Sequence, residues 1–74
     1  MRRVKVISAP AAMAPSVPDM LTLAQSFADH DNQPYALYEL KREGRQVFML
    51  SSCLSAEPPA AYAQLAVVDP SSWS

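Results

Sequence analysis

A charged turn between two β-prone runs most constrains the fold of this chain. Residues 35–42 and 45–52 are rich in aromatic and aliphatic side chains, and they flank Glu43 and Gly44, the only glycine in the sequence. Two such runs joined through a turn that contains glycine are typical of a β-hairpin. The sequence therefore predicts a hairpin over residues 35–52.

Two registers are open for this hairpin. If Glu43 and Gly44 form a two-residue turn, Tyr38 faces Met49. If Gly44 instead takes a left-handed bulge position after a type I turn, Tyr38 faces Phe48. We expect the bulge, because glutamate is unfavourable at the first position of a type I′ turn, where φ is positive. In either register both faces of the hairpin carry large apolar side chains, and one helix can cover only one of them.

A strand and a helix are expected before the hairpin. Residues 1–8 alternate valines with basic side chains, and this period of two predicts an edge strand. Residues 16–30 open with Ser16 and Asp19, a helix-capping pair, and continue with apolar residues at helical spacing. The outer face of this helix is uncharged between Asp19 and Asp29, so another chain could cover it, and a solvated face is the alternative.

The C-terminal third is less constrained. Residues 57–66 open with Glu57-Pro58-Pro59, a typical helix entry, and are then rich in alanine, which favours a short helix, although Val67 and Val68 could equally form a short strand. Residues 69–74 form a turn and a tail that contains Trp73, expected to be docked or bound at an interface. The chain, residues 1–74, is thus expected to be a single small α+β domain of order β-α-β-β-α. One main helix would pack on a three-stranded, mostly antiparallel sheet.

Composition excludes several classes of protein. A chain of 74 residues is near the lower limit for independent folding, and its single cysteine excludes an intrachain disulfide. One histidine and one cysteine are too few for an ordinary zinc site, and a single glycine excludes a phosphate-binding glycine loop. Lys5 and Pro10 interrupt the apolar N-terminal stretch, so an edge strand is favoured over a signal peptide. No run is long enough to span a membrane, and a cytoplasmic location is expected.

Two clusters have residue types found in catalytic or metal sites. The sequence Ser51-Ser52-Cys53 contains nucleophiles, but a nucleophile needs a base, and no motif connects it with His30. The sequence Asp29-His30-Asp31 contains metal-ligand types, but adjacent helical residues point in different directions. We therefore expect no enzyme activity, no metal and no cofactor. A small enzyme, or a subunit of an enzyme, is a third hypothesis, which needs a cleft that brings His30 near Cys53.

The leading hypothesis is a non-enzymatic protein-interaction module, such as a regulator, inhibitor or accessory subunit, that binds a partner protein and forms a homodimer. It follows from the excess of apolar surface on the sheet and the lack of a catalytic set. In size, glycine content and helix-plus-hairpin order the chain resembles small accessory proteins of phages, plasmids and bacterial operons, a resemblance that involves no particular residue. The expected interface side chains are Tyr35, Leu37, Phe48 and Trp73.

The alternative is a nucleic-acid-binding accessory protein. All basic side chains lie in the first strand and at the hairpin tip, and they would form one basic edge if these segments were neighbours. A net charge of −1 gives no general attraction to nucleic acid, and the same residues could instead steer a protein partner. These residues are Arg2, Arg3, Lys5, Lys41, Arg42 and Arg45.

Overall fold

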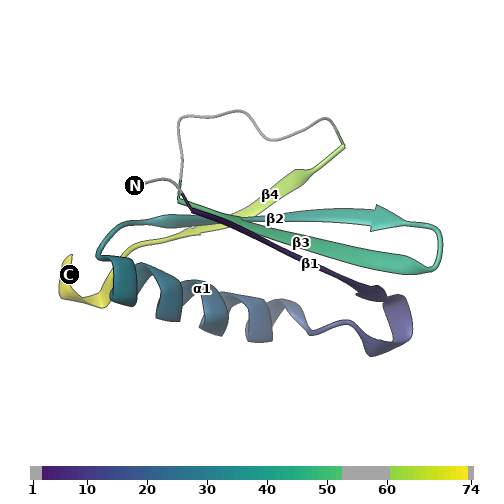
Figure 1. Cartoon of the computed structure of the whole chain (residues 1–74), viewed down its shortest axis with the longest axis horizontal. Helices are drawn as coiled ribbons and strands as arrows, with labels where there is room; N and C mark the ends of the chain where they lie inside the picture. Colours follow the sequence, from purple (N-terminus) through teal and green to yellow (C-terminus); the bar gives the residue numbers. More distant parts are fainter. Residues whose placement is uncertain (1–2, 53–60, 74) are drawn as a thin grey trace.

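In the computed structural model, the chain folds into a four-stranded antiparallel sheet with one long helix packed on one face (Figure 1). The structure describes residues 3–52 and 61–73. The strands lie side by side in the order β1-β3-β2-β4. The elements are β1 (Val4–Pro10), a 3-10 turn η1 (Ala11–Met13), α1 (Val17–Asp31), β2 (Tyr35–Arg42), β3 (Arg45–Ser51), β4 (Ala63–Val68) and a second 3-10 turn η2 (Ser71–Trp73).

The α+β class is confirmed, but the expected three-stranded sheet and its element order are wrong. Residues Ala63–Val68 form a fourth strand that pairs with β2, so the helix predicted over residues 57–66 does not extend through this segment. Residues 57–60 of that prediction lie outside the described residues. The preference of alanine for helices is weak, and pairing with the open edge of β2 overrides it. The described elements thus follow the order β-α-β-β-β.

The predicted helix is confirmed, with both ends capped. Ser16 accepts a hydrogen bond from the backbone N–H of Asp19 at 3.2 Å, and the Asp19 carboxylate accepts one from the N–H of Ser16 at 3.4 Å. At the other end Asn32 adopts the left-handed conformation, with φ of 54°, and stops the helix. The capping pair read from the sequence therefore sets the start of α1.

The predicted hairpin is present in the two-residue register, and the expected bulge register is wrong. Tyr38 pairs with Met49, and Arg42 pairs with Arg45 across the turn. Gly44 has φ of 70°, whereas Glu43 is not among the residues with positive φ. A turn with positive φ only at its second position needs glycine only there, as in type II geometry. The objection to glutamate in the first position therefore does not apply.

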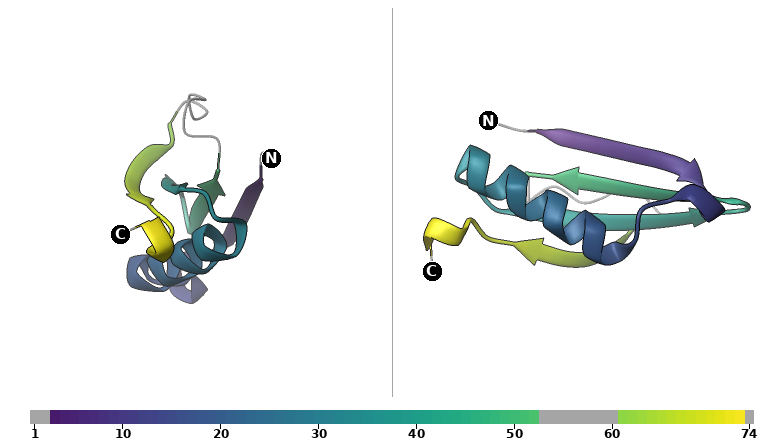
Figure 2. Two further views of the ribbon diagram at one scale, coloured as in Figure 1. Left: turned by 90° about the vertical axis from the view of Figure 1, so that its left-hand side faces the viewer. Right: turned by 90° about the horizontal axis from the view of Figure 1, so that it is seen from below.

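The core lies between α1 and one face of the sheet (Figure 2). The helix packs mainly against β2 and β4, while Ile7 of β1 packs against the edge of the same core and Arg3, just before β1, pairs with Asp31 of α1. Its aromatic ring at Phe27 meets Tyr35 edge-to-face, with ring centroids 5.6 Å apart. The fully buried members of this core are Met20, Ala24, Ala28, Tyr35, Leu37, Phe48 and Leu50.

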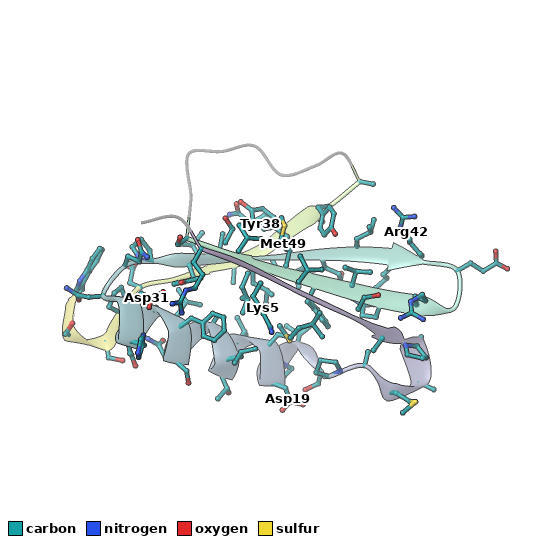
Figure 3. All side chains as sticks on the ribbon, viewed as in Figure 1. Lys5, Asp19, Asp31, Tyr38, Arg42 and Met49 are labelled. Atoms are coloured by element: carbon teal, nitrogen blue, oxygen red, sulfur yellow. The ribbon has the colours of Figure 1, made fainter. Side chains whose placement is uncertain are left out.

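The face of the sheet that is turned away from α1 is called the outer face here. Tyr38 and Met49 lie on it, and Lys5 lies on the helix side (Figure 3). Its central part is buried, because Tyr38 is 3% exposed. Its margins are not, since Val4 and Val6 on β1 are clearly exposed. By cross-strand pairing the outer face carries Val4, Val6, Ser8, Ala36, Tyr38, Leu40, Val47, Met49 and Val67.

Within the described residues, no helix is long and apolar enough to cross a membrane.

Candidate protein-interaction surface

The first strand of the chain has one free edge. Among residues 3–52 and 61–73, β3 is the only strand that pairs with β1. The pairing is antiparallel and runs from Val4 to Pro10 without a register shift. Such an edge carries backbone groups with the capacity to bond another strand.

The direction of these backbone groups follows from the hydrogen bonds at the two ends of the β1–β3 ladder. The N–H of Ser52 donates to the carbonyl of Arg3 at 3.0 Å, and the N–H of Ala11 donates to the carbonyl of Gly44 at 3.0 Å. In an antiparallel ladder, residues alternate between bonding the neighbour and pointing away from it. The odd-numbered residues of β1 therefore bond β3. The N–H and C=O groups of Val4, Val6 and Ser8 point to the free edge.

Exposed apolar side chains accompany these outward backbone groups. Val4 is 45% exposed and Val6 is 53% exposed, and Val6 lies beside Met49 on the outer face. Pro10 occupies an outward position as well, where its missing N–H removes no bond to β3. The outward backbone groups of Val4, Val6 and Ser8, together with the two valine side chains, are called the β1 edge below.

The opposite edge of the sheet, on β4, is built differently. The β2–β4 ladder shifts register between Leu37 and Tyr38, so β4 carries an irregularity in the middle of its short length. A bulge twists an edge strand and interrupts its row of hydrogen-bonding groups. Leu65 and Val67 are exposed there, at 39% and 46%. Of the two edges, β1 offers the longer regular ladder.

Three of the four predicted interface side chains lie inside the chain's own core. Tyr35 and Leu37 are 0% exposed and Phe48 is 2% exposed, all beneath α1. In this fold they have no surface to offer a partner. Their alternation with outer-face residues could be read from the sequence, but which of the two faces the helix covers could not.

The fourth predicted interface residue, Trp73, is 55% exposed. Its indole Nε1–H donates to Oδ1 of Asn32 at 3.0 Å. The turn η2 that carries it is fixed to α1 through Asp29, whose carboxylate accepts a hydrogen bond from the N–H of Ser71 at 2.7 Å. That hydrogen bond, with one from Gln25, lowers the pKa of Asp29. Trp73 is therefore docked by its polar edge while part of its ring stays in solvent.

Asp31 joins the end of α1 to the first residues of β1 and β2. Its carboxylate accepts hydrogen bonds from the Tyr35 hydroxyl and from His30 Nδ1, and it lies 3.5 Å from Nη1 of Arg3. The hydrogen bond with His30 and then that with Tyr35 lower the pKa of Asp31. Burial, followed by the hydrogen bond to Asp31, raises the pKa of Tyr35 to about 12.

This cluster has the geometry of a structural link between elements. Beside it lies an open hollow of about 300 Å³, lined by Arg3, Asp31, Asn32 and Gln33. Among residues 3–52 and 61–73, the lining includes no cysteine, serine or threonine that could serve as a nucleophile. Asp29 and Asp31 bind different partners and do not converge on one ion, and residues 3–52 and 61–73 contain no cluster suited to a metal.

In the Ser51-Ser52-Cys53 cluster, the two serines contribute to the fold at the end of β3. Ser51 is 6% exposed on the outer face, and Ser52 Oγ accepts a hydrogen bond from the N–H of Arg3 at 2.7 Å. Cys53 lies outside the described residues, so the structure does not test whether it lies near His30.

The basic side chains fall into two groups rather than one edge. Arg3 is paired with Asp31, and Lys5 follows it near the start of β1. The second group, at the hairpin tip, comprises Lys41, Arg42 and Arg45, and Arg45 lies opposite Pro10 at the far end of β1. From Lys5 to Pro10 a strand advances about 17 Å at ~3.4 Å per residue. Arg2 lies outside the described residues.

Comparison of the chain with family models, with curated proteins and with solved structures finds no match in any of the three.

Proposed function

We propose that the chain is a non-enzymatic protein-interaction module that binds a partner protein by strand addition at the β1 edge. The observation that carries this proposal is the coincidence of outward backbone groups and exposed valines on one regular edge strand. In strand addition, main-chain hydrogen bonds supply affinity, and the alternate side chains supply specificity. The β1 edge offers both on residues Val4, Val6 and Ser8.

The energetics are consistent with a modest, specific contact. Removing a valine side chain completely from water gains about 1.5–3 kcal/mol. About half of the Val4 and Val6 surface is still exposed, at 45% and 53%, so each has about 1 kcal/mol left to gain. Backbone hydrogen bonds at a solvent-exposed edge add about 0.5–1.5 kcal/mol each.

A nucleic-acid-binding role is the second candidate, based on Lys41, Arg42 and Arg45 at the exposed hairpin tip. The gap of about 17 Å along β1 between Lys5 and the residue opposite Arg45 weakens the case for one continuous phosphate track. Retention on heparin that falls steeply with salt, and that is lost in the double variant Arg42→Ala/Arg45→Ala, would favour this role.

The test of the proposed function is an affinity capture with the tagged full-length chain, with and without nuclease. The variant Val6→Lys places a charge on the β1 edge, whereas Val67→Lys makes the same change at an exposed valine of the β4 edge. We expect a stoichiometric protein, either a second copy or another chain, that survives nuclease, is retained by Val67→Lys and is lost with Val6→Lys. Binding that survives Val6→Lys, or that depends on nucleic acid, would refute strand addition at this edge.

A further inference from the structure

We propose that the occupant of the β1 edge is the β1 strand of a second copy of this chain. The two strands would run antiparallel and be centred on Val6, so that the two sheets join into one. This inference rests on the proposed function and names its partner. The free edge of β1 and its two exposed valines are the starting point.

The spacing of the outward groups is self-complementary. Val4, Val6 and Ser8 are evenly spaced along β1, with Val6 in the middle. In an antiparallel pair about a two-fold axis at Val6, this residue exchanges both backbone hydrogen bonds with Val6 of the partner subunit. Val4 does the same with Ser8 of the partner subunit, and Ser8 with Val4 of the partner subunit. Every outward N–H and C=O of these three residues is then paired.

Neighbouring registers are less favourable. A shift that centres the pair on Lys5 places the two lysine side chains directly opposite each other, and like charges in that position are destabilising. A shift that centres the pair on Ile7 places Val4 opposite Pro10 of the partner subunit, which has no N–H to donate. The Val6-centred register places Lys5 opposite Ile7 of the partner subunit and Arg3 opposite Ala9, with no like charges in opposition.

The rest of the fold leaves room for this pairing. The helix packs mainly against β2 and β4, and only its C-terminal end comes near the start of β1, where Asp31 pairs with Arg3 (Figure 2). In the antiparallel pairing the two helix ends therefore lie at opposite ends of the seam. Arg3 on the helix side is paired with Asp31. On the outer face, the exposed valines of both copies come together at the seam beside Met49. The contact thus covers apolar surface on one face, and on the other face it places no two like charges directly opposite each other.

The two edges also account for a closed dimer rather than a fibre. An isologous pairing about a two-fold axis uses the β1 edge of both copies, so no β1 edge is left free to add a third chain. The remaining edges are both β4, whose ladder is interrupted between Leu37 and Tyr38 of its neighbour β2. A chain of 74 residues buries only about 60% of its unfolded surface when it folds alone, less than a larger domain does, so such association also adds to stability.

The experiment compares the molar mass in solution of the full-length chain and its variants over a range of concentrations. We expect the wild-type mass to be twice that of one chain. The variant Val6→Pro removes an N–H that faces the free edge and no bond to β3, so we expect a folded chain with half the wild-type mass. By the same alternation the N–H of Val67 on β4 points outward, so Val67→Pro is the matched control and should keep the dimer.

A second variant guards against misfolding of the proline variant. Val6→Lys keeps the backbone donor but places like charges opposite each other at the centre of the pair, and it should also halve the mass with unchanged circular dichroism. A wild-type monomer at all concentrations, or a dimer that survives both Val6 variants, would overturn the inference. In either case the proposed function would still stand if Val6→Lys abolished capture of a different protein.

The register has its own readout. In a Cys53→Ser background, an equimolar mixture of Lys5→Cys and Ile7→Cys chains should form a disulfide-linked dimer under mild oxidation. The two positions face each other as a non-hydrogen-bonded pair, with Cα atoms about 4.5 Å apart, which suits a disulfide. The Lys5→Cys chain alone should cross-link much less. Efficient cross-linking of Lys5→Cys with itself would overturn the Val6-centred register.

Discussion

The hydroxyl of Tyr35 donates a hydrogen bond to the carboxylate of Asp31, which joins the first residue of β2 to the last residue of α1. The same carboxylate lies beside Arg3, just before β1. One acidic side chain therefore connects the helix to two strands of the sheet. Because Tyr35 is also at the centre of the core, its ionisation is coupled to folding.

Alkaline pH should destabilise the fold through Tyr35. Its pKa is raised from 10.0 to about 12, so the native state holds the phenolic proton more tightly than the unfolded chain does. The resulting stabilisation is complete below pH 10 and is lost as the pH rises from 10 through about 12. Urea unfolding at pH 8, 10, 11 and 12 measures this loss.

The control for this prediction is Tyr35→Phe, which lacks the titrating group. Its urea midpoint should be lower than that of the wild type at pH 8, because the hydrogen bond to Asp31 is gone. Between pH 10 and 12 its midpoint should fall less steeply than that of the wild type. An equal loss in both proteins would show that Tyr35 is not responsible.

Acid should release the C-terminal turn η2 from α1. The pKa of Asp29 is lowered, chiefly by the hydrogen bond from the N–H of Ser71, so the contact contributes stability above the ordinary value of 3.8. That contribution is lost as the pH falls through the lowered pKa. Trp73 is the only tryptophan, and its fluorescence should shift to the red as the turn detaches.

The variant Asp29→Asn tests the same contact at neutral pH. It removes the charge that binds Ser71, so the emission of Trp73 should already be shifted, while the circular dichroism of the sheet and helix stays unchanged. Asp19→Asn, at the other end of α1, is the matched control and should leave the emission as in the wild type. A shift of equal size in both variants would mean that general loosening of the helix is responsible.

Local signals in the sequence predicted the elements whose causes are local. The capping pair of Ser16 and Asp19 fixes the start of α1, and the glycine at position 44 fixes the hairpin. The register was predicted wrongly because the turn type depends on the φ of Glu43, which sequence does not display. The strand Ala63–Val68 was missed because its partner, β2, lies far away in the sequence.

The interface residues show the limit of a pattern of period two. Alternation separates Leu37 and Phe48 from Tyr38 and Met49, but it does not tell which set the helix covers. The long-range contact of α1 with β2 decides this, and it buries Tyr35, Leu37 and Phe48. The sequence also could not predict which backbone groups of β1 point to the free edge, because this depends on which neighbouring strand bonds the odd-numbered residues.

Phe48 therefore serves as a test of which face is buried. Phe48→Ala should cost about 3–5 kcal/mol of unfolding free energy, because it opens a cavity beneath α1. Val6→Ala, on an exposed strand edge, should cost less than ~1 kcal/mol in the dissociated chain. Urea unfolding at low protein concentration measures both values. A small loss for Phe48→Ala would mean that α1 does not cover this face.

The hairpin turn offers a test of backbone strain that is free of packing effects. Gly44 has φ of 70°, and a Cβ added there would meet no atom within 4 Å. Gly44→Ala should therefore cost about 1–2 kcal/mol, purely because an L-residue is forced into the left-handed region. Gly44→Asn should cost less, since asparagine tolerates this region better. Glu43→Ala, whose φ is not positive, should change stability by less than about 0.5 kcal/mol. If the Gly44→Ala and Gly44→Asn variants were as stable as the wild type, the turn would have to adopt another geometry. The pairing of Tyr38 with Met49 would then no longer follow from the turn.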